Sequence, residues 1–327
     1  MSAGSDFGHQ PVLLQPVIDL LAIKPAGVYI DCTLGGAGHA AAILARLGAG
    51  GRLIALDRDE DALREGRRQL DSRKSPAAWQ AVHANFADLG ATLQSLSIPA
   101  VDGILADLGV SSWQLDQSGR GFGYSQEGPL DMRMNRVTGP TAADVVNSYS
   151  EEDLVRILRE YGEERYAGRI AAAIVAYRCH QPFRTTTELA ELVRRAMPAA
   201  GRQEAQHPAR RTFQAIRIEV NQELAAIEKL LADAPALLNP AGRLCIITFH
   251  SLEDRLVKDA FRRLENPCTC PRDFPVCVCG KKPLGRVVTR KAVVADPAEQ
   301  KANPRSRSAK LRCFERQTIS EEVERHV

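Results

Sequence analysis

A glycine-rich segment and an aspartate that follows it have the residue types needed to hold a nucleoside. Gly35, Gly36 and Gly38 come just after an apolar, strand-forming stretch, and Asp57 ends the next such stretch. Glycine allows a tight turn between a strand and a helix, and an aspartate at a strand end can accept hydrogen bonds from both hydroxyls of a ribose. We therefore expect Asp57 to be a ribose ligand.

The glycine segment departs from the Gly-x-Gly-x-x-Gly motif of dinucleotide-binding folds, because Ala41 stands where the third glycine belongs. That motif serves a pyrophosphate, which S-adenosylmethionine lacks. The departure therefore favours S-adenosylmethionine over a nicotinamide dinucleotide. Considered without Asp57, the glycine segment has an alternative interpretation: a turn that needs glycine for packing and binds no ligand.

Another aspartate, Asp107, ends a later apolar stretch that begins at Val101. In open α/β sheets, groups at this edge face the bound ligand. We expect Asp107 to contact the cofactor and to be the catalytic residue. The alternative is structural: Asp107 caps the following turn, and Ser111 and Ser112 cap a helix.

The segment from Gly119 to Met134 is rich in glycine and in side chains that stack on bases or bind phosphate. Such a segment suits a flexible lid over a nucleic-acid base. It predicts four side chains exposed toward RNA, namely Arg120, Phe122, Tyr124 and Arg133.

Positive charge is unevenly distributed along the 327 residues. The formal net charge is only +3, but the stretch from Lys281 to Arg316 has eleven Lys or Arg against three acidic residues. Basic patches bind phosphates by releasing counterions. The alternative for this stretch is a solvated tail. We also expect Arg210, Arg211 and Arg217 to contact phosphate, and the alternative for these arginines is a solvated helix start.

Strand and helix patterns alternate along the chain and predict a mostly parallel sheet with helices on both faces. Between about 118 and 211 the sequence has helix caps, at Ser150 and Thr185, and helical periodicity but no strand pattern. We expect a long helix over 213–238 and a turn at 239–242. Strands are expected at 28–30, 53–56, 79–83, 101–106 and 244–249.

These patterns divide the chain into a first part of the core, 1–117, a helical insertion, 118–211, and a second part of the core with a basic tail, 212–327. The apolar stretch at 244–249 is far too short to cross a bilayer, and the first residues lack a secretory signal pattern. We therefore expect a cytoplasmic protein.

Eight ordered segments span nearly the whole chain: His9–Leu14, Asp31–His39, Asp107–Asp116, Gly128–Arg133, Tyr161–Glu164, His207–Arg217, Phe249–Arg255 and Arg305–Arg312. These segments resemble the MraW-type family of bacterial small-subunit ribosomal RNA methyltransferases. The resemblance implies a class I, Rossmann-like, S-adenosylmethionine-dependent methyltransferase core with an inserted all-helical domain. It also implies methylation of the exocyclic N4 amine of a cytidine in the decoding region of 16S rRNA.

The same resemblance implies which residues contact the cofactor. Two departures from the family pattern are local: Trp113 stands where proline is usual, and Ala37 stands where glycine is common. Neither removes a charged contact. The residues implied are Gly35, Ala37, Gly38, His39, Asp57, Phe86, Asp107 and Gln114, although a lone Phe after a strand is more often a core residue.

The implied reaction depends on positioning, because the exocyclic amine of cytosine is a poor nucleophile whose lone pair is delocalised into the ring. Asp107, or the carbonyl beside it, is the expected hydrogen-bond acceptor. Asp107-Leu-Gly-Val replaces the Asn/Asp-Pro-Pro-Tyr motif of many amine methyltransferases, so the aromatic platform is expected from Phe122, Tyr124 or Trp113. His250 is the second catalytic candidate, either as a general base or as a structural cap.

Four of the eight cysteines form two Cys-x-Cys pairs in one short stretch. Converging thiolates could hold one structural zinc ion. Reduced thiols are the first alternative, and disulfides come last because a cytosolic location disfavours them. The predicted ligands are Cys268, Cys270, Cys277 and Cys279.

Three function classes remain: an RNA cytosine methyltransferase, a dinucleotide-dependent oxidoreductase, and a non-catalytic RNA-binding assembly factor. The absent third glycine argues against the second. The combination of Asp57, Asp107 and the lid argues against the third, because a pure binder does not need an acidic residue beside a cofactor. We expect the first, with S-adenosyl-L-methionine as cofactor and 16S rRNA within the small ribosomal subunit as partner; a homodimer is compatible with this.

Overall fold

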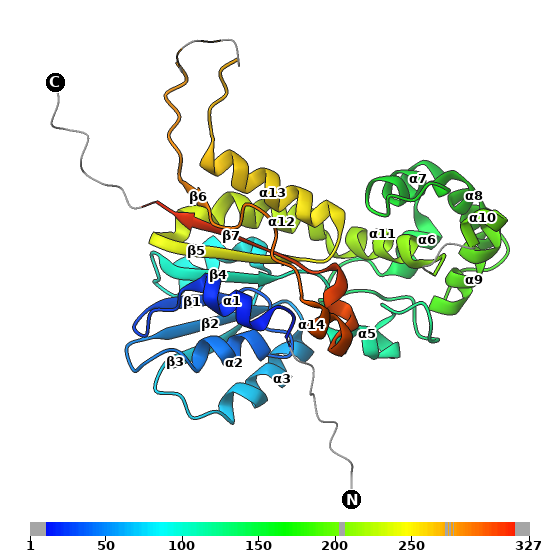
Figure 1. Cartoon of the computed structure of the whole chain (residues 1–327). Helices are drawn as coiled ribbons and strands as arrows, with labels where there is room; N and C mark the ends of the chain where they lie inside the picture. The colour runs from blue at the N-terminus through cyan, green and yellow to red at the C-terminus, as the bar shows by residue number, and fades with distance from the viewer. Residues whose placement is uncertain (1–10, 203–206, 272–273, 275, 277, 318–327) are drawn as a thin grey trace, which may run out of the picture. The chain divides into compact units, whose positions relative to one another are not determined.

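The computed structural model describes residues 11–202, 207–271, 274, 276 and 278–317 (Figure 1). The chain divides into two compact units. We call Met1–Gly109 together with Ala225–Val327 the sheet unit, and Val110–Leu224 the helical unit. The helical unit is wider than the predicted insertion at both ends, because Val110 and Leu115 before it and Phe213 after it pack into the helical core.

The sheet unit contains one seven-stranded sheet of order β3-β2-β1-β4-β5-β7-β6. The first five strands are parallel, which confirms the predicted mostly parallel sheet, and β7 runs antiparallel to β5 and β6. The sequence pattern did not predict β6 and β7. The strands are β1 Val28–Asp31, β2 Arg52–Asp57, β3 Ala78–His83, β4 Val101–Asp107, β5 Leu238–Thr248, β6 Gly285–Val287 and β7 Lys310–Arg316.

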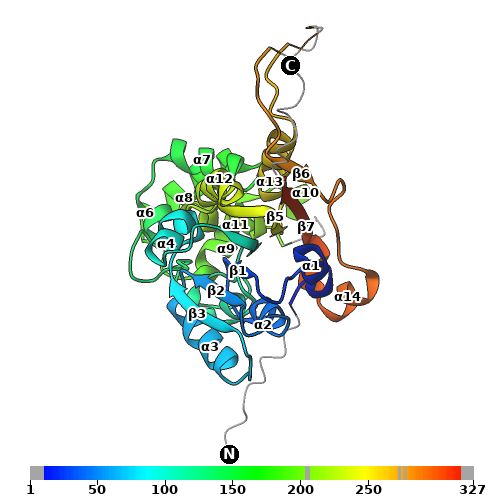
Figure 2. The ribbon, with the colours of Figure 1, turned by 90° about the vertical axis from the view of Figure 1, so that its left-hand side faces the viewer.

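Helices cover both faces of this sheet, as predicted. Figure 2 shows that α1, α2 and α3 lie on one face of the sheet and α4, α12 and α13 on the other. The central strands are therefore buried from both sides, which explains the unbroken apolar run Leu53–Leu56 in β2. The helices are α1 Leu14–Leu21, α2 Gly38–Leu44, α3 Glu60–Asp71, α4 Leu89–Ser95, α12 Glu223–Asp233, α13 Ser251–Glu265 and, before β7, α14 Pro297–Ala302.

The helical unit has a core of its own, and its helices begin where the sequence predicted. Ser150 Oγ accepts a hydrogen bond from Asp153 N, and Thr185 closes a capping box with Glu188, which confirms both N-caps. The helices are α5 Ser112–Asp116, α6 Ala142–Ser148, α7 Glu151–Glu160, α8 Ala167–Arg178, α9 Thr186–Ala196, α10 Ala199–Arg202 and α11 Arg210–Asn221.

Two local predictions are wrong. The long helix expected over 213–238 is two helices, α11 and α12, because Gln222 adopts a left-handed conformation with φ 50° between them. The turn expected at 239–242 lies inside β5, where the pairing with β4 shifts register between Val101 and Gly103. Extra residues in one strand form a bulge and leave the pairing on either side intact.

Within the described residues, no helix combines the length and the apolar character needed to cross a bilayer.

Asn221, the last residue of α11, ties that helix to the segment 132–134. Its Oδ1 accepts a hydrogen bond from Met134 N at 2.8 Å, and its Nδ2 donates to the carbonyl of Met132 at 2.7 Å. The side chain is only 7% exposed. Burying a backbone group without a hydrogen-bond partner is costly, so this amide stabilises the last residues of the predicted lid.

We predict that Asn221→Ala lowers the free energy of unfolding of the helical unit by about 2 kcal/mol or more, because it removes the partners of two buried backbone groups. The chain has two tryptophans, Trp79 in the sheet unit and Trp113 in the helical unit. Urea unfolding followed by fluorescence in a Trp79→Phe background therefore reports on the helical unit. Gln181→Ala, at an exposed amide of the same unit, is the control and should change little.

Candidate active site

Three neighbouring parallel strands each end in an aspartate. β1, β2 and β4 end at Asp31, Asp57 and Asp107, and β1 lies between the other two. Because the strands are parallel, their carboxyl ends meet at one edge of the sheet, where α/β folds bind ligands. Asp31 was not among the predicted site residues, although it ends a strand just as Asp57 and Asp107 do.

The carboxylate of Asp57 holds the glycine segment in place. Its Oδ2 accepts a hydrogen bond from Gly35 N at 2.9 Å, and its Oδ1 accepts one from Asp59 N at 2.9 Å. A carboxylate oxygen can accept more than one hydrogen bond, so both oxygens keep capacity for ribose hydroxyls. Burial raises the pKa of the Asp57 carboxyl to about 6, against the lowering effect of these two backbone donors.

The backbone at the start of α2 explains why glycine is common at position 37 in the family. Ala37 is in the left-handed region, with φ 59°, which glycine adopts without strain. Gly38 follows, and a Cβ there would lie 2.2 Å from Pro11 Cγ, so this position requires glycine while Pro11 stays in place. A Cβ built on Gly36 would have no atom within 4 Å, so the loop has open space beside this residue.

His39 lies in the first turn of α2 and faces Asp107. Its Nε2 is 3.0 Å from the carbonyl oxygen of Val12. Because a carbonyl only accepts, Nε2 carries the proton and Nδ1 keeps a lone pair, 3.6 Å from Asp107 Oδ2. Burial lowers the pKa of His39 to about 4, so the ring is neutral and supplies no positive charge to the aspartates.

Asp107 is held by its backbone, while its carboxyl lacks a strong partner. Asp107 N donates a hydrogen bond to Thr33 Oγ1 at 2.7 Å. Oδ1 is buried without a hydrogen-bond partner among the described residues. Burial, reinforced by the nearby charges of Asp31 and Glu253, raises the pKa of Asp107 to about 8.

Asp31 completes this group of carboxyls. Its Oδ1 accepts a hydrogen bond from Thr33 N at 3.1 Å, whereas Oδ2 is buried without a partner in the described part of the chain. Burial and the charge of Asp57 raise the pKa of Asp31 to about 7. The edge therefore holds more carboxyls than it can keep ionised, which favours a cationic ligand.

His250 is the N-cap of α13, the structural alternative that the sequence left open. Its Nδ1 accepts from Glu253 N at 3.5 Å, and its Nε2 lies 3.2 Å from Glu253 Oε1. Glu253 is fully buried and its Oε2 accepts from Phe249 N at 2.7 Å. These contacts account for His250 as a cap, and its role as a general base stays a prediction.

The remaining predicted cofactor residues lie in different units. Phe86 begins a short 3-10 turn directly after β3 and is half-buried, as an adenine wall at this edge would be. Gln114 lies in the helical unit, where its Oε1 accepts from Ser111 N at 3.0 Å and Ser111 Oγ accepts from Gln114 N at 3.2 Å. This confirms the Ser111 cap, and the cofactor contact of Gln114 stays a prediction.

Two of the predicted lid residues are buried, so their expected exposure to RNA is wrong. Arg120 is 4% exposed and donates hydrogen bonds to the carbonyls of Arg133 and Met134, both at 3.1 Å. Phe122 is 6% exposed and joins the core of the helical unit. Carbonyl oxygens of the lid itself satisfy the guanidinium, which sequence composition alone cannot reveal.

Other predicted RNA contacts are engaged within the helical unit. Arg133 forms a two-pronged ion pair with Asp131, at 2.9 Å for each bond, and Arg217 forms one with Glu223, at 2.8 and 2.9 Å. Tyr124 is half-buried and stacks on His207 with ring centroids 4.5 Å apart. The predicted contacts of Arg210 and Arg211, which are half-buried at the start of α11, stay predictions.

Part of the basic stretch is neutralised within the sheet unit. Arg286 pairs with Glu315, and both Lys310 and Arg312 pair with Asp254. These contacts join β6, β7 and α13, which is a structural role that the sequence analysis did not separate from phosphate binding. The residues that are exposed and not in these pairs are Lys281, Lys282, Arg290, Lys291, Lys301 and Arg307.

The raised pKa of Asp107 predicts a pH-dependent loss of stability. Between its ordinary value of 3.8 and about 8, the folded chain holds a proton that the unfolded chain has lost. Stability therefore falls as pH rises through this range, by up to about 1.4 kcal/mol per pH unit for one proton. We expect Asp107→Asn to lose less stability than the wild type between pH 5 and 8.

Urea unfolding at a series of pH values, without added ligand, measures this difference. Asp71→Asn, at an exposed carboxyl at the end of α3, is the matched control and should follow the wild-type profile. Identical slopes for Asp107→Asn and the wild type would contradict the pKa assigned to Asp107.

Comparison with known proteins identifies the family of this chain. The model of the MraW methylase family matches residues 6–317. The ribosomal RNA small subunit methyltransferase H of Symbiobacterium thermophilum is 53% identical over 319 residues, which cover 97% of this chain and 99% of that protein. The protein of the same name from Carboxydothermus hydrogenoformans is 53% identical over 314 residues, covering 95% of this chain and 98% of its own. This chain is a member of the MraW methylase family.

Proposed function

We propose that this enzyme uses S-adenosylmethionine to methylate the exocyclic N4 amine of a cytidine in the decoding region of 16S rRNA, in the small ribosomal subunit. The observation that carries the proposal is the group of three aspartates at the carboxyl edge of β1, β2 and β4. The names of the close relatives support a small-subunit rRNA substrate.

The residues at the sheet edge fit S-adenosylmethionine in two ways. Asp57 has spare acceptor capacity for ribose hydroxyls, and the carboxyls of Asp31 and Asp107 each have one buried oxygen without a hydrogen-bond partner among the described residues. S-adenosylmethionine supplies the activated methyl group, and it carries both a ribose and a positively charged sulfonium. Burial, and to a lesser extent repulsion between carboxylates, raises the pKa values of Asp31 and Asp107, and a positive charge here would stabilise their ionised forms.

Asp107 is the residue that would act on the amine. With its pKa raised to about 8, its carboxyl holds a proton at neutral pH in the absence of a cation. A neighbouring positive charge lowers that pKa and favours the carboxylate, which accepts hydrogen bonds. An acceptor fixed through Asp107 N and Thr33 can orient an amino group and receive its proton.

RNA would be held by aromatic and basic groups. Tyr124 and His207 form a stacked pair that offers a surface for a base, and six exposed Lys or Arg between Lys281 and Arg307 can contact phosphates. A cytoplasmic location follows from this substrate. A homodimer stays a prediction of the sequence.

The first test separates ribose binding from general stability. Asp57→Ala removes a charged acceptor, so we expect S-adenosylmethionine to bind about 10- to 100-fold more weakly by isothermal titration. Asp102→Ala is the control: Asp102 also accepts a backbone hydrogen bond, from Val28 N, but at the opposite end of β4. Equal weakening by both variants, or by neither, would argue against the ribose assignment.

The second test addresses turnover. Asp107→Ala should bind S-adenosylmethionine but transfer labelled methyl groups to small-subunit particles about a hundredfold more slowly, because an acceptor that positions the amine is lost. The particles come from a strain lacking this enzyme. Mass spectrometry of the product locates the methyl group, and a label found on any atom but a cytidine N4 would refute the proposed reaction. Full transfer by Asp107→Ala would refute only the role of this residue.

A further inference from the structure

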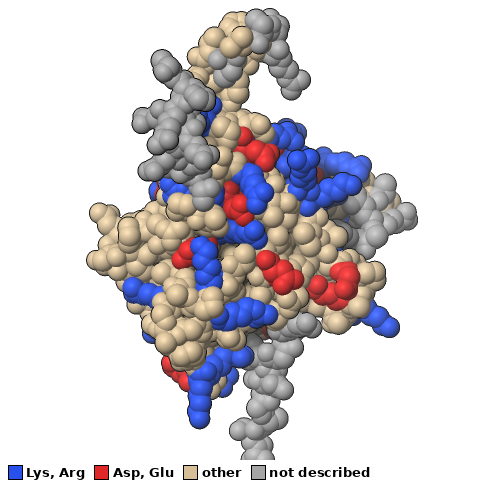
Figure 3. All heavy atoms as spheres, turned by 60° about the vertical axis from the view of Figure 1, so that its left-hand side comes forward, with Lys and Arg blue, Asp and Glu red and all other residues tan. Residues whose placement is uncertain are grey.

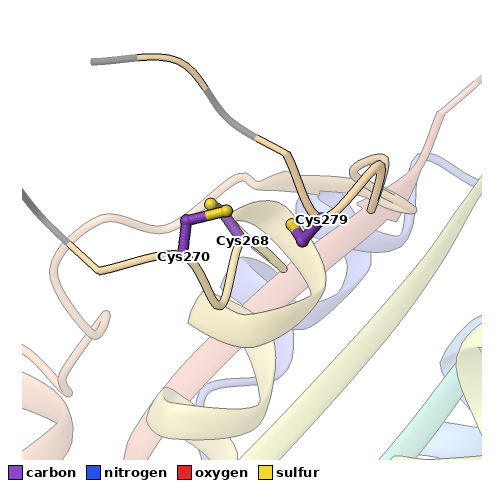
Figure 4. Close-up of side chains that lie close together, drawn as sticks. All are labelled: Cys268, Cys270 and Cys279. Atoms are coloured by element: carbon purple, nitrogen blue, oxygen red, sulfur yellow. The ribbon is translucent and has the colours of Figure 1, made fainter. Parts of the chain in front are cut away.

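Three cysteines that have no part in the proposed reaction lie together at the far end of α13. The Sγ atoms of Cys268, Cys270 and Cys279 all lie within 4.8 Å of one another (Figure 4). The fourth cysteine of the stretch, Cys277, lies outside the described residues. Three sulfur ligands at such distances are compatible with one tetrahedral ion, for which Zn–S bonds of about 2.3 Å place neighbouring sulfurs about 3.8 Å apart.

The cysteines lie in a long segment between α13 and β6 that projects from the sheet unit (Figures 1 and 2). Its base is closed by hydrogen bonds from Leu284 N to the Leu264 carbonyl, at 2.9 Å, and from Val287 N to Glu265 Oε1, at 2.8 Å. Its described residues form no helix or strand from Asn266 to Leu284. Loops of this length in compact proteins need a stabilising feature or a function.

Apolar burial does not supply that stabilisation. Phe274, Val276 and Val278 are 49%, 70% and 72% exposed. Figure 3, in which the segment lies at the top, shows its described atoms as mainly neither acidic nor basic. The segment therefore has few side chains with which to build a core or a salt-bridge network, and a metal ion is the feature its composition offers instead.

Local backbone geometry favours thiolates at these positions. Val278 N donates a hydrogen bond to Cys270 Sγ at 3.3 Å, the kind of contact that stabilises a metal-bound sulfur. Gly280, directly after Cys279, adopts φ 64°, which lets the chain turn sharply after a ligand. Soft thiolate ligands in a tetrahedral set select zinc over magnesium or calcium.

We propose that Cys268, Cys270 and Cys279 bind one structural zinc ion that stabilises the segment between α13 and β6. The 15 residues of α13 separate this centre from the carboxyl end of β5 by about 22 Å, at about 1.5 Å per helical residue. The ion therefore has no contact with the reacting groups at the sheet edge. The centre supports the fold and is independent of the proposed methyl transfer.

Metal analysis of the full chain tests the site. Wild-type protein, expressed with zinc in the medium and purified without chelator, should contain close to one zinc per chain by inductively coupled plasma mass spectrometry. Cys268→Ser, Cys270→Ser and Cys279→Ser should each lose most of it. Cys179→Ser, at an exposed cysteine in the helical unit, is the matched control and should retain the metal. Zinc-free wild type, or zinc retained in all three ligand variants, would overturn the proposal.

Two further readouts do not depend on how the variants fold. Cobalt(II) added to the metal-free wild type should give the strong sulfur-to-metal charge-transfer absorption of a thiolate centre, and Cys179→Ser should give the same spectrum. A strong chelator should speed tryptic cleavage of the wild type after the exposed Lys281, because Pro283 blocks cleavage after Lys282. A cobalt spectrum without thiolate bands, or mass spectrometry that finds disulfides among these cysteines in protein kept reduced, would rule the site out.

Discussion

The burial of several ionisable carboxyls at one edge of the sheet, reinforced by repulsion between them, is the constraint on which the functional site depends. Asp31, Asp57 and Asp107 end three adjacent parallel strands, and burial raises the pKa of each. Their neighbour His39 is held neutral by burial and cannot offset the negative charge. Ionising these buried carboxyls is unfavourable without a ligand and becomes favourable when a cation binds. A positively charged ligand is therefore electrostatically complementary to this edge.

Asp57 couples the shape of the glycine loop to ligand binding. The same carboxylate that accepts from Gly35 N is the expected ribose ligand, so the loop and the sugar would be held by one group. Thr33 similarly connects two of the aspartates. Its backbone N donates a hydrogen bond to Asp31 Oδ1, and its hydroxyl oxygen accepts one from Asp107 N. The site is therefore preorganised by backbone contacts, which leave one buried carboxyl oxygen each of Asp31 and Asp107 without a hydrogen-bond partner among the described residues.

The parts of the fold that the sequence predicted share one property: they depend on local pattern. The parallel strands, the caps at Ser150 and Thr185 and the existence of a helical insertion all follow from residues close together in the chain. β6 and β7 escaped prediction because they are short or mixed in character and gain their stability by pairing with β5, far away in sequence. The break at Gln222 was hidden because the apolar pattern continues through it.

The sequence by itself determined the strand-end positions of Asp57 and Asp107 and the pairs of cysteines after α13, because these features lie within short, recognisable runs. Only the tertiary structure decided which charged groups are available. Arg120, Arg133 and Arg217 look alike as lid or phosphate ligands, yet each guanidinium is bound by carbonyls or carboxylates of the helical unit. It likewise brought Asp31 and Glu253 close enough to shift the pKa of Asp107. Electrostatic interactions depend on distance in space and on burial, and neither quantity is written in the order of residues.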